Sequence, residues 1–157
     1  MLTGGASPAA LLWPMLAQVG LTFALYAWLT VARLQAVRRR EVEFACFVLG
    51  RDEPPGIARI TRNLSNQFEL PVVFYAVCVL LVGLDRVTGF DVAAAWVFVL
   101  GRIVHTAVQT LTDDVPLRGR VFMINFLAVV ALVGHVAVLA WQGGSAEPGR
   151  SADQSIR

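Results

Sequence analysis

A set of polar and charged side chains leads directly into an uncharged segment of the chain. Arg62, Asn66 and Glu69 are spaced i, i+4 and i+7, so in a helix all three project from one face. The uncharged run 70–84 begins immediately after Glu69. A carboxylate carried into lipid costs roughly 2.5–3.5 kcal/mol on insertion scales, so Glu69 must face water or other helices and find a partner. The pattern therefore predicts a polar cavity inside a membrane.

A second polar face follows in a later apolar segment. Arg102, His105 and Gln109 are spaced i, i+3 and i+7 and again share one side of a helix. At a rise of 1.5 Å per residue, Arg102 lies about 15 Å from the nearer end of its segment, and Glu69 is at a similar depth. We expect these two residues to form an ion pair, because pairing lets both stay charged in a medium of low dielectric constant. Such a pair either fixes the helix register or contacts a ligand directly.

The chemistry of this set favours ligand binding over the common catalytic arrangements. The sequence has no paired carboxylate site, no Cys/His metal cluster, no glycine-rich phosphate loop and no plausible Ser-His-Asp set. His105 by itself is more typical of a packing residue than of a catalyst, and Arg59 is typical of an anchor at the membrane interface. Arginines, Asn66, Gln109 and His105 together suit an anionic ligand that forms many hydrogen bonds and has one end near lipid.

The elements that position these residues are four membrane-spanning helices. Of the 157 residues, 57% are hydrophobic, and no charged residue occurs before Arg33 or between Arg120 and Glu147. About 20 apolar residues suffice to cross the hydrocarbon of a bilayer. The predicted fold is therefore all-α, an antiparallel four-helix bundle over residues 1–142, followed by a disordered polar tail, 143–157. The predicted spans are 11–34, 57–84, 92–112 and 117–141.

Charge distribution predicts the orientation of the bundle. With Arg102 left out, nine arginines lie toward one face (33, 38, 39, 40, 51, 59, 62, 118 and 120) and three toward the other (86, 150 and 157). The positive-inside rule places the 35–58 and 113–120 loops in the cytoplasm and both termini outside. A net charge of +2 without a basic patch interleaved with aromatics excludes a nucleic-acid partner. Cys46 and Cys78 are expected to be free thiols.

The motif residues resemble those of the MAPEG family, the membrane-associated proteins in eicosanoid and glutathione metabolism. Arg62, Asn66 and Glu69, followed shortly by Pro71, match the Arg-x3-Asn-x2-Glu pattern of the family's second helix. The segment 101–106 looks like its third helix. Arg118 stands sixteen residues after Arg102, as the family pattern expects, and Arg38 resembles the basic residue that closes the first helix. The resemblance covers all four spans.

This resemblance implies a homotrimer of four-helix protomers in a bacterial inner membrane, with glutathione bound between subunits toward the cytoplasm. Arg118 would stabilise the glutathione thiolate as the catalytic residue, while a lipophilic electrophile approaches from the bilayer. A neighbouring guanidinium favours the thiolate, which is the competent nucleophile. The residues that would bind the co-substrate are Arg38, Arg62, Asn66, Glu69, His105 and Gln109.

One departure concerns the chemistry. Transferase-like family members carry a tyrosine one turn after the His105 position, where this chain has Gln109. Pro71 also comes two residues after Glu69 instead of three or four. The leading hypothesis is a membrane glutathione transferase or peroxidase-like protein acting on lipophilic electrophiles. Two alternatives stay open: a non-catalytic protein that binds a lipid or amphipath in the same groove, and a scaffold whose polar pairs only specify assembly.

Overall fold

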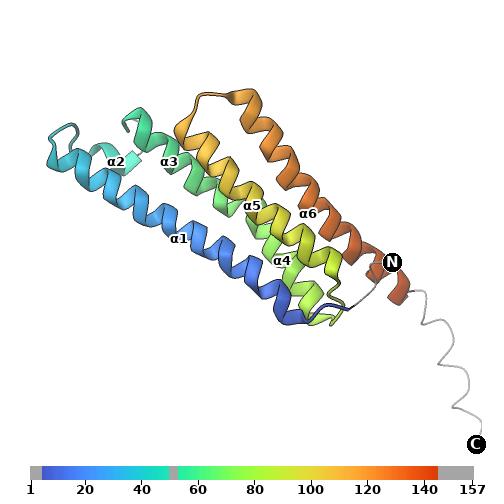
Figure 1. Cartoon of the computed structure of the whole chain (residues 1–157). Coiled ribbons are helices and arrows are strands. Elements are labelled where there is room, and N and C mark those ends of the chain that lie inside the picture. The colour runs from blue at the N-terminus through green and yellow to red at the C-terminus, as the bar shows by residue number, and fades with distance from the viewer. Residues whose placement is uncertain (1–4, 50–52, 145–157) are drawn as a thin grey trace, which may run out of the picture.

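The computed structural model describes residues 5–49 and 53–144, and these fold into a bundle of long helices (Figure 1). Four stretches are long and apolar enough to cross a membrane, namely Pro8–Arg38, Pro55–Gly83, Gly89–Leu111 and Val115–Gly144. They correspond to the four predicted spans, each beginning or ending a few residues from its predicted limit. The all-α membrane fold expected from the sequence is confirmed. The predicted tail falls almost wholly outside the described residues.

The first span is a single helix, α1 (Pro8–Arg38). Proline at its first turn costs little, because the first N–H groups of a helix have no internal partner. Beyond Arg38 the chain turns through Arg40, whose φ of 58° is left-handed, into the short helix α2 (Cys46–Leu49). Glu53 then binds the Arg33 guanidinium, and the Thr61 hydroxyl donates to Glu53 at 2.7 Å. These contacts attach the end of the loop to both neighbouring helices.

The second span is interrupted. It consists of α3 (Pro55–Ser65), one turn of 3₁₀-helix, η1 (Asn66–Phe68), and α4 (Leu70–Gly83). Glu69 joins the two parts with φ and ψ both near −103°, outside the helical region. Pro71 lies in the first turn of α4, where its missing N–H is tolerated, but it cannot continue the hydrogen-bond ladder from α3. The break therefore lies directly before the proline.

The last two helices, α5 (Gly89–Leu111) and α6 (Val115–Gly144), form a long antiparallel pair. A capping box begins α5: Thr88 and Asp91 each bind the other's backbone N–H. Asp114 accepts a hydrogen bond from the Leu117 N–H at 2.8 Å and so caps α6. The other oxygen of Asp91 lies 2.8 Å from His135 Nδ1, which ties α6 to the start of α5.

The contact between α5 and α6 includes one close steric fit. Asn125 of α6 is fully buried, and its side-chain oxygen would lie only 1.9 Å from a Cβ built on Gly101 of α5. Real Cβ atoms do not approach so closely, so only glycine fits at position 101 with Asn125 in place. The adjoining core is apolar and aromatic, and it includes the stacked rings of Phe74 and Phe98, 4.4 Å apart. This core holds α5 and α6 against each other next to the polar end of the bundle.

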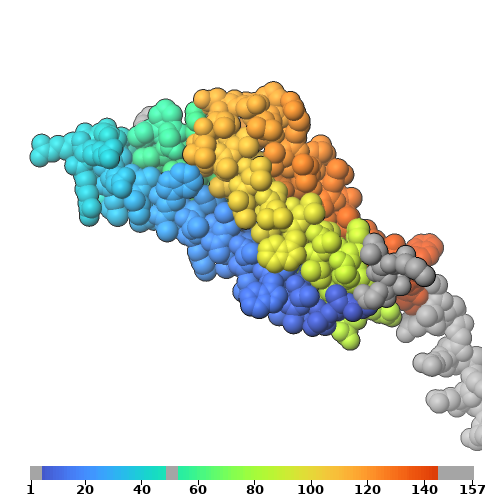
Figure 2. Space-filling model, in the orientation of Figure 1, coloured from blue at the N-terminus to red at the C-terminus, as the bar shows by residue number. Residues whose placement is uncertain are grey.

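One end of the bundle gathers elements that are far apart in the sequence. In Figure 2 residues 112–120, which form the α5–α6 connection and the first turns of α6 and are coloured orange, lie beside the green α3, and the blue α1 packs along the yellow α5. Apolar side chains such as Trp13, Phe23 and Leu100 are exposed on the outside of the bundle, as expected for a surface in lipid. The polar residues of α3, α5 and α6 meet at the same end.

Candidate functional site

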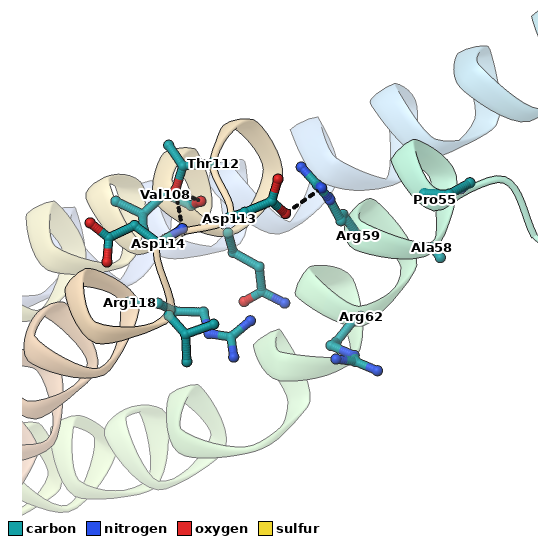
Figure 3. A pocket seen from close by; sticks show the side chains of 11 residues that line it. Pro55, Ala58, Arg59, Arg62, Val108, Thr112, Asp113, Asp114 and Arg118 are labelled. Atoms are coloured by element: carbon teal, nitrogen blue, oxygen red, sulfur yellow. Dashed lines mark hydrogen bonds and ion pairs between the residues drawn. The ribbon is translucent and has the colours of Figure 1, made fainter.

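Two adjoining hollows lie where α3, α5 and the start of α6 meet. The outer hollow has a volume of about 270 Å³ and the inner hollow about 320 Å³. Arg62, Gln109, Val115 and Arg118 line both, so the two hollows form one continuous site. The site is reached from the end of the bundle that carries the α5–α6 connection (Figure 3).

The inner hollow brings together most of the residues singled out from the sequence. Its polar lining consists of Arg62, Asn66, His105, Gln109 and Arg118. They come from α3, η1, α5 and α6, so the bundle is needed to assemble the set. The two polar faces expected from helical spacing therefore meet in the structure. Phe122 completes the lining, and its ring centroid lies 6.3 Å from that of His105.

Two arginines supply the positive charge of the site. Arg62 enters from α3 and Arg118 from the first turns of α6 (Figure 3). Among the described residues, neither guanidinium has an ion-pair partner within 4.0 Å. Their charges are thus available to an anionic group placed between the helices. Arg118 is half-buried, which strengthens its electrostatic effect on such a group.

A side-chain hydrogen bond connects the two polar faces. Asn66 Nδ2 donates to Gln109 Oε1 at 3.0 Å. Gln109 is only 5% exposed, and it lines both hollows from the middle. Position 109 therefore presents an amide, bonded to Asn66, to both hollows.

Charged residues that the sequence interpretation did not assign to the site line the outer hollow. Arg59 of α3 binds Asp113 in the α5–α6 connection, a contact drawn as a dashed line in Figure 3. Arg59 was interpreted as an interfacial anchor, and its ion pair with Asp113 adds a link across the mouth of the site. The one sign of this contact in the sequence was that Arg59 and Asp113, which carry opposite charges, lie near the ends of two predicted spans.

Arg102 has a different partner from the one expected. It is 1% exposed, and its Nη2 donates to the backbone oxygen of Asn66 at 3.1 Å. Glu69 attracts the guanidinium electrostatically, but among the described residues no ion pair joins the two. The physical reason is the break in the second span, which frees the carbonyl of Asn66 and turns Glu69 outward. Glu69 is exposed on the surface of the protomer.

Two other expected features lie apart from the hollows of a single protomer. Arg38 is the last residue of α1 and is exposed, and neither Arg38 nor Glu69 lines a hollow.

His105 is 3% exposed, and its Nδ1 has no hydrogen-bond partner among the described residues. Within the described ranges, no group of three His, Cys, Asp or Glu side chains is placed to hold a metal ion.

Comparison with known proteins gives one match. The model of the MAPEG family matches residues 11–138, which include the second and third spans whole, most of the first and last spans, and every residue of the two hollows. No curated protein and no solved structure matches the chain significantly.

Proposed function

Because the chain belongs to the MAPEG family, we propose that it is a multi-pass membrane protein that binds glutathione and transfers it to lipophilic electrophiles. The family includes glutathione transferases and related proteins. The observation that carries the proposal is the pair Arg62 and Arg118, which line one hollow with Asn66 and His105 and have no carboxylate partner among the described residues. Glutathione has two carboxylates, two amides and a thiol, so it offers groups for each of these side chains.

The proposed reaction needs only a thiolate and an electrophile. Arg118 stabilises the thiolate of bound glutathione, and the thiol proton passes to solvent. The sulfur then attacks an electrophilic carbon, a C–S bond forms, and the leaving group departs with its bonding electron pair. Phe122, which is exposed beside the inner hollow, provides an apolar surface for a substrate that arrives through lipid. His105 has no role as a base in this scheme.

The proposal includes assembly into a homotrimer with sites between subunits. Glu69 is an exposed carboxylate near the middle of a span, where facing lipid costs roughly 2.5–3.5 kcal/mol. A neighbouring copy that covers this face removes the cost. The same arrangement lets the exposed Arg38 reach a site on the adjacent protomer. Arg38 and Glu69 then join Arg62, Asn66, His105 and Gln109 as co-substrate ligands.

We place the protein in a bacterial inner membrane, with the site toward the cytoplasm and both termini in the periplasm. The excess of arginine near the 35–58 and 113–120 loops supports this orientation. Glutathione would then enter the outer hollow from the cytoplasm, past Arg59 and Asp113.

One observation favours a second function. Gln109 stands in place of the tyrosine, so no aromatic hydroxyl is available near the thiol. A protein that holds an amphipath in the same groove without turnover needs no such hydroxyl. A scaffold whose polar contacts only specify assembly needs no ligand at all.

One experiment separates the three functions. The purified protein in detergent is titrated with glutathione by calorimetry, and conjugation of glutathione to 1-chloro-2,4-dinitrobenzene is followed by absorbance. Binding with turnover is the expected result. Binding without turnover supports the non-catalytic protein, and a lack of binding supports the scaffold.

A further inference from the structure

The chain leaves the end of α1 through an arginine in the left-handed conformation. Arg40 has a φ of 58°, and its N–H donates to the Val37 carbonyl at 2.9 Å. The next N–H, that of Glu41, donates to the Ala36 carbonyl at 3.0 Å and closes the last turn. Glycine is the usual residue at this position, because a Cβ crowds the following carbonyl oxygen there. An arginine that stays in a strained conformation suggests a function for its side chain.

The Arg40 side chain lines a hollow in the loop that follows α1, which we call the loop hollow. It has a volume of about 720 Å³, and its lining comprises Val37, Arg40, Glu41, Val42, Glu43 and Phe44. Arg40 and Glu43 are exposed, and among the described residues neither has an ion-pair partner within 4.0 Å. Glu41 lies 3.9 Å from Arg39 in an exposed and therefore weak pair. The loop hollow thus presents charges of both signs beside apolar side chains.

The loop hollow lies at the level of the lipid headgroups. With 31 residues at 1.5 Å each, α1 reaches about 46 Å, which exceeds the roughly 30 Å of hydrocarbon. The first charged residue of α1 is Arg33, so the residues beyond it belong to the membrane interface. In Figure 2 the loop after α1, coloured cyan, protrudes at one end of the bundle. Phe44 is 62% exposed in this loop and offers an apolar surface to a lipid.

The charges of the loop hollow select the kind of headgroup. A guanidinium such as that of Arg40 binds phosphate oxygens through charge-assisted hydrogen bonds. A carboxylate accepts hydrogen bonds from a primary ammonium, which has three N–H donors. A headgroup with negative charge alone would be repelled by Glu41 and Glu43. Phosphatidylethanolamine carries a phosphate and a primary ammonium on one headgroup, so it matches both signs.

We propose that the loop hollow binds the headgroup of phosphatidylethanolamine, with Arg40 on the phosphate, Glu43 on the ammonium and Phe44 against the glycerol and the first methylenes. The loop hollow shares no residue with the two hollows between α3, α5 and α6, and this inference does not depend on glutathione binding. A bound lipid attaches the loop after α1 to the surrounding leaflet and stabilises the folded protein.

The test measures the melting temperature of the purified protein in a neutral detergent, alone and with one of three added lipids. These are dioleoylphosphatidylethanolamine, dioleoylphosphatidylcholine, whose ammonium has no N–H, and dioleoylphosphatidylglycerol, which has no ammonium. The ethanolamine lipid is expected to raise the melting temperature of the wild type by at least about 3 °C more than either of the others. Equal increases, no increase, or the largest increase from the glycerol lipid overturns the proposal.

Arg40→Gly separates the backbone strain from the binding of lipid. Without lipid this variant should melt about 2–4 °C higher than the wild type, because glycine adopts the left-handed conformation freely. It should also lose the increase caused by the ethanolamine lipid. Asp85→Gly is the matched control, since Asp85 has a φ of 52° at the same position after α4 and does not line the loop hollow. It should keep the full increase.

Glu43→Gln tests the ammonium contact. This variant should respond to the ethanolamine and choline lipids within about 1 °C of each other. Arg40→Asn, which also tolerates the left-handed conformation, replaces Arg40→Gly if that variant does not assemble. A full lipid increase without the arginine, or a wild-type preference in Glu43→Gln, overturns the assignment. A shift in gel-filtration elution of both Arg40 variants would show that a second copy covers the loop hollow, which also overturns it.

Discussion

The Nη2 atom of Arg102 lies 3.1 Å from the backbone oxygen of Asn66 and closes the open C-terminal end of α3 inside the bundle. A helix C-terminus carries a partial negative charge, and a cation there contributes up to about 2 kcal/mol in a partly buried setting. The arginine therefore satisfies a carbonyl that the break before Pro71 sets free. The guanidinium of Arg102 is thus positioned by a backbone carbonyl in addition to the electrostatic attraction of Glu69.

The first prediction concerns the partner of Arg102. Arg102→Met leaves the Asn66 carbonyl without its donor, and the free energy of unfolding should fall by about 1–3 kcal/mol. Glu69→Gln should cost less, because the exposed carboxylate is not in ion-pair contact with the guanidinium. Thermal unfolding in detergent measures both variants. Equal losses would show that the carboxylate is the main partner of Arg102.

The fit between Gly101 and Asn125 gives a second prediction. Gly101→Ala places a Cβ against the Asn125 oxygen and should destabilise the protein by about 1–3 kcal/mol, as overpacking does. The double variant Gly101→Ala/Asn125→Ala removes the clash and should recover most of the loss. Gly134→Ala is the control, since a Cβ there meets nothing within 4 Å. A Gly101→Ala variant with the melting temperature of Gly134→Ala would contradict the fit.

Turnover should depend on Arg118. With the guanidinium removed, the thiolate loses its neighbouring cation, and Arg118→Ala should lower kcat for conjugation by at least about 100-fold, the size of effect seen for a single lost oxyanion donor. Arg120→Ala is the matched control, because Arg120 lies two residues further along α6 and lines neither hollow. Unchanged turnover in Arg118→Ala, with gel filtration unaltered, would remove Arg118 from the mechanism.

Orientation in the membrane is testable with the two thiols. Cys46 is partly exposed in α2, whereas Cys78 is buried in α4. A membrane-impermeant thiol reagent should label Cys46 in inside-out vesicles and leave it unlabelled in intact cells whose outer barrier has been opened. A Cys46→Ser variant shows the background from Cys78. Labelling of Cys46 from outside would reverse the proposed topology.

Much of the fold follows from the sequence because the apolar spans have sharp limits. The uncharged runs before Arg33 and between Arg120 and Glu147 placed the first and last spans close to the helices that the structure shows. The break at η1 was only partly visible. Pro71 indicates a disturbed ladder, but the sequence does not show that the second span becomes 3₁₀-helical over Asn66–Phe68.

The site was predictable as a set of residues but not as a set of contacts. Helical spacing identified Asn66 and Gln109 separately, yet their hydrogen bond depends on the rotation of α3 relative to α5, which spacing does not determine. The acceptor for Arg102 is a backbone carbonyl, and every residue has one, so side-chain types carried no sign of it. Arg38 and Glu69 were assigned to the site by resemblance, and in one protomer they remain outside the hollows.

The interruption of the second span also bears on how the protein is made. α4 has 14 residues, which at 1.5 Å per residue reach about 21 Å, short of the roughly 30 Å of hydrocarbon. The polar end of α3 must cross the remaining depth, and the Asn66 carbonyl at this end accepts a hydrogen bond from Arg102, which the ribosome adds later. We therefore expect the second span to stay at the translocon until α5 has been synthesised, so that the two enter the bilayer together as a helical hairpin.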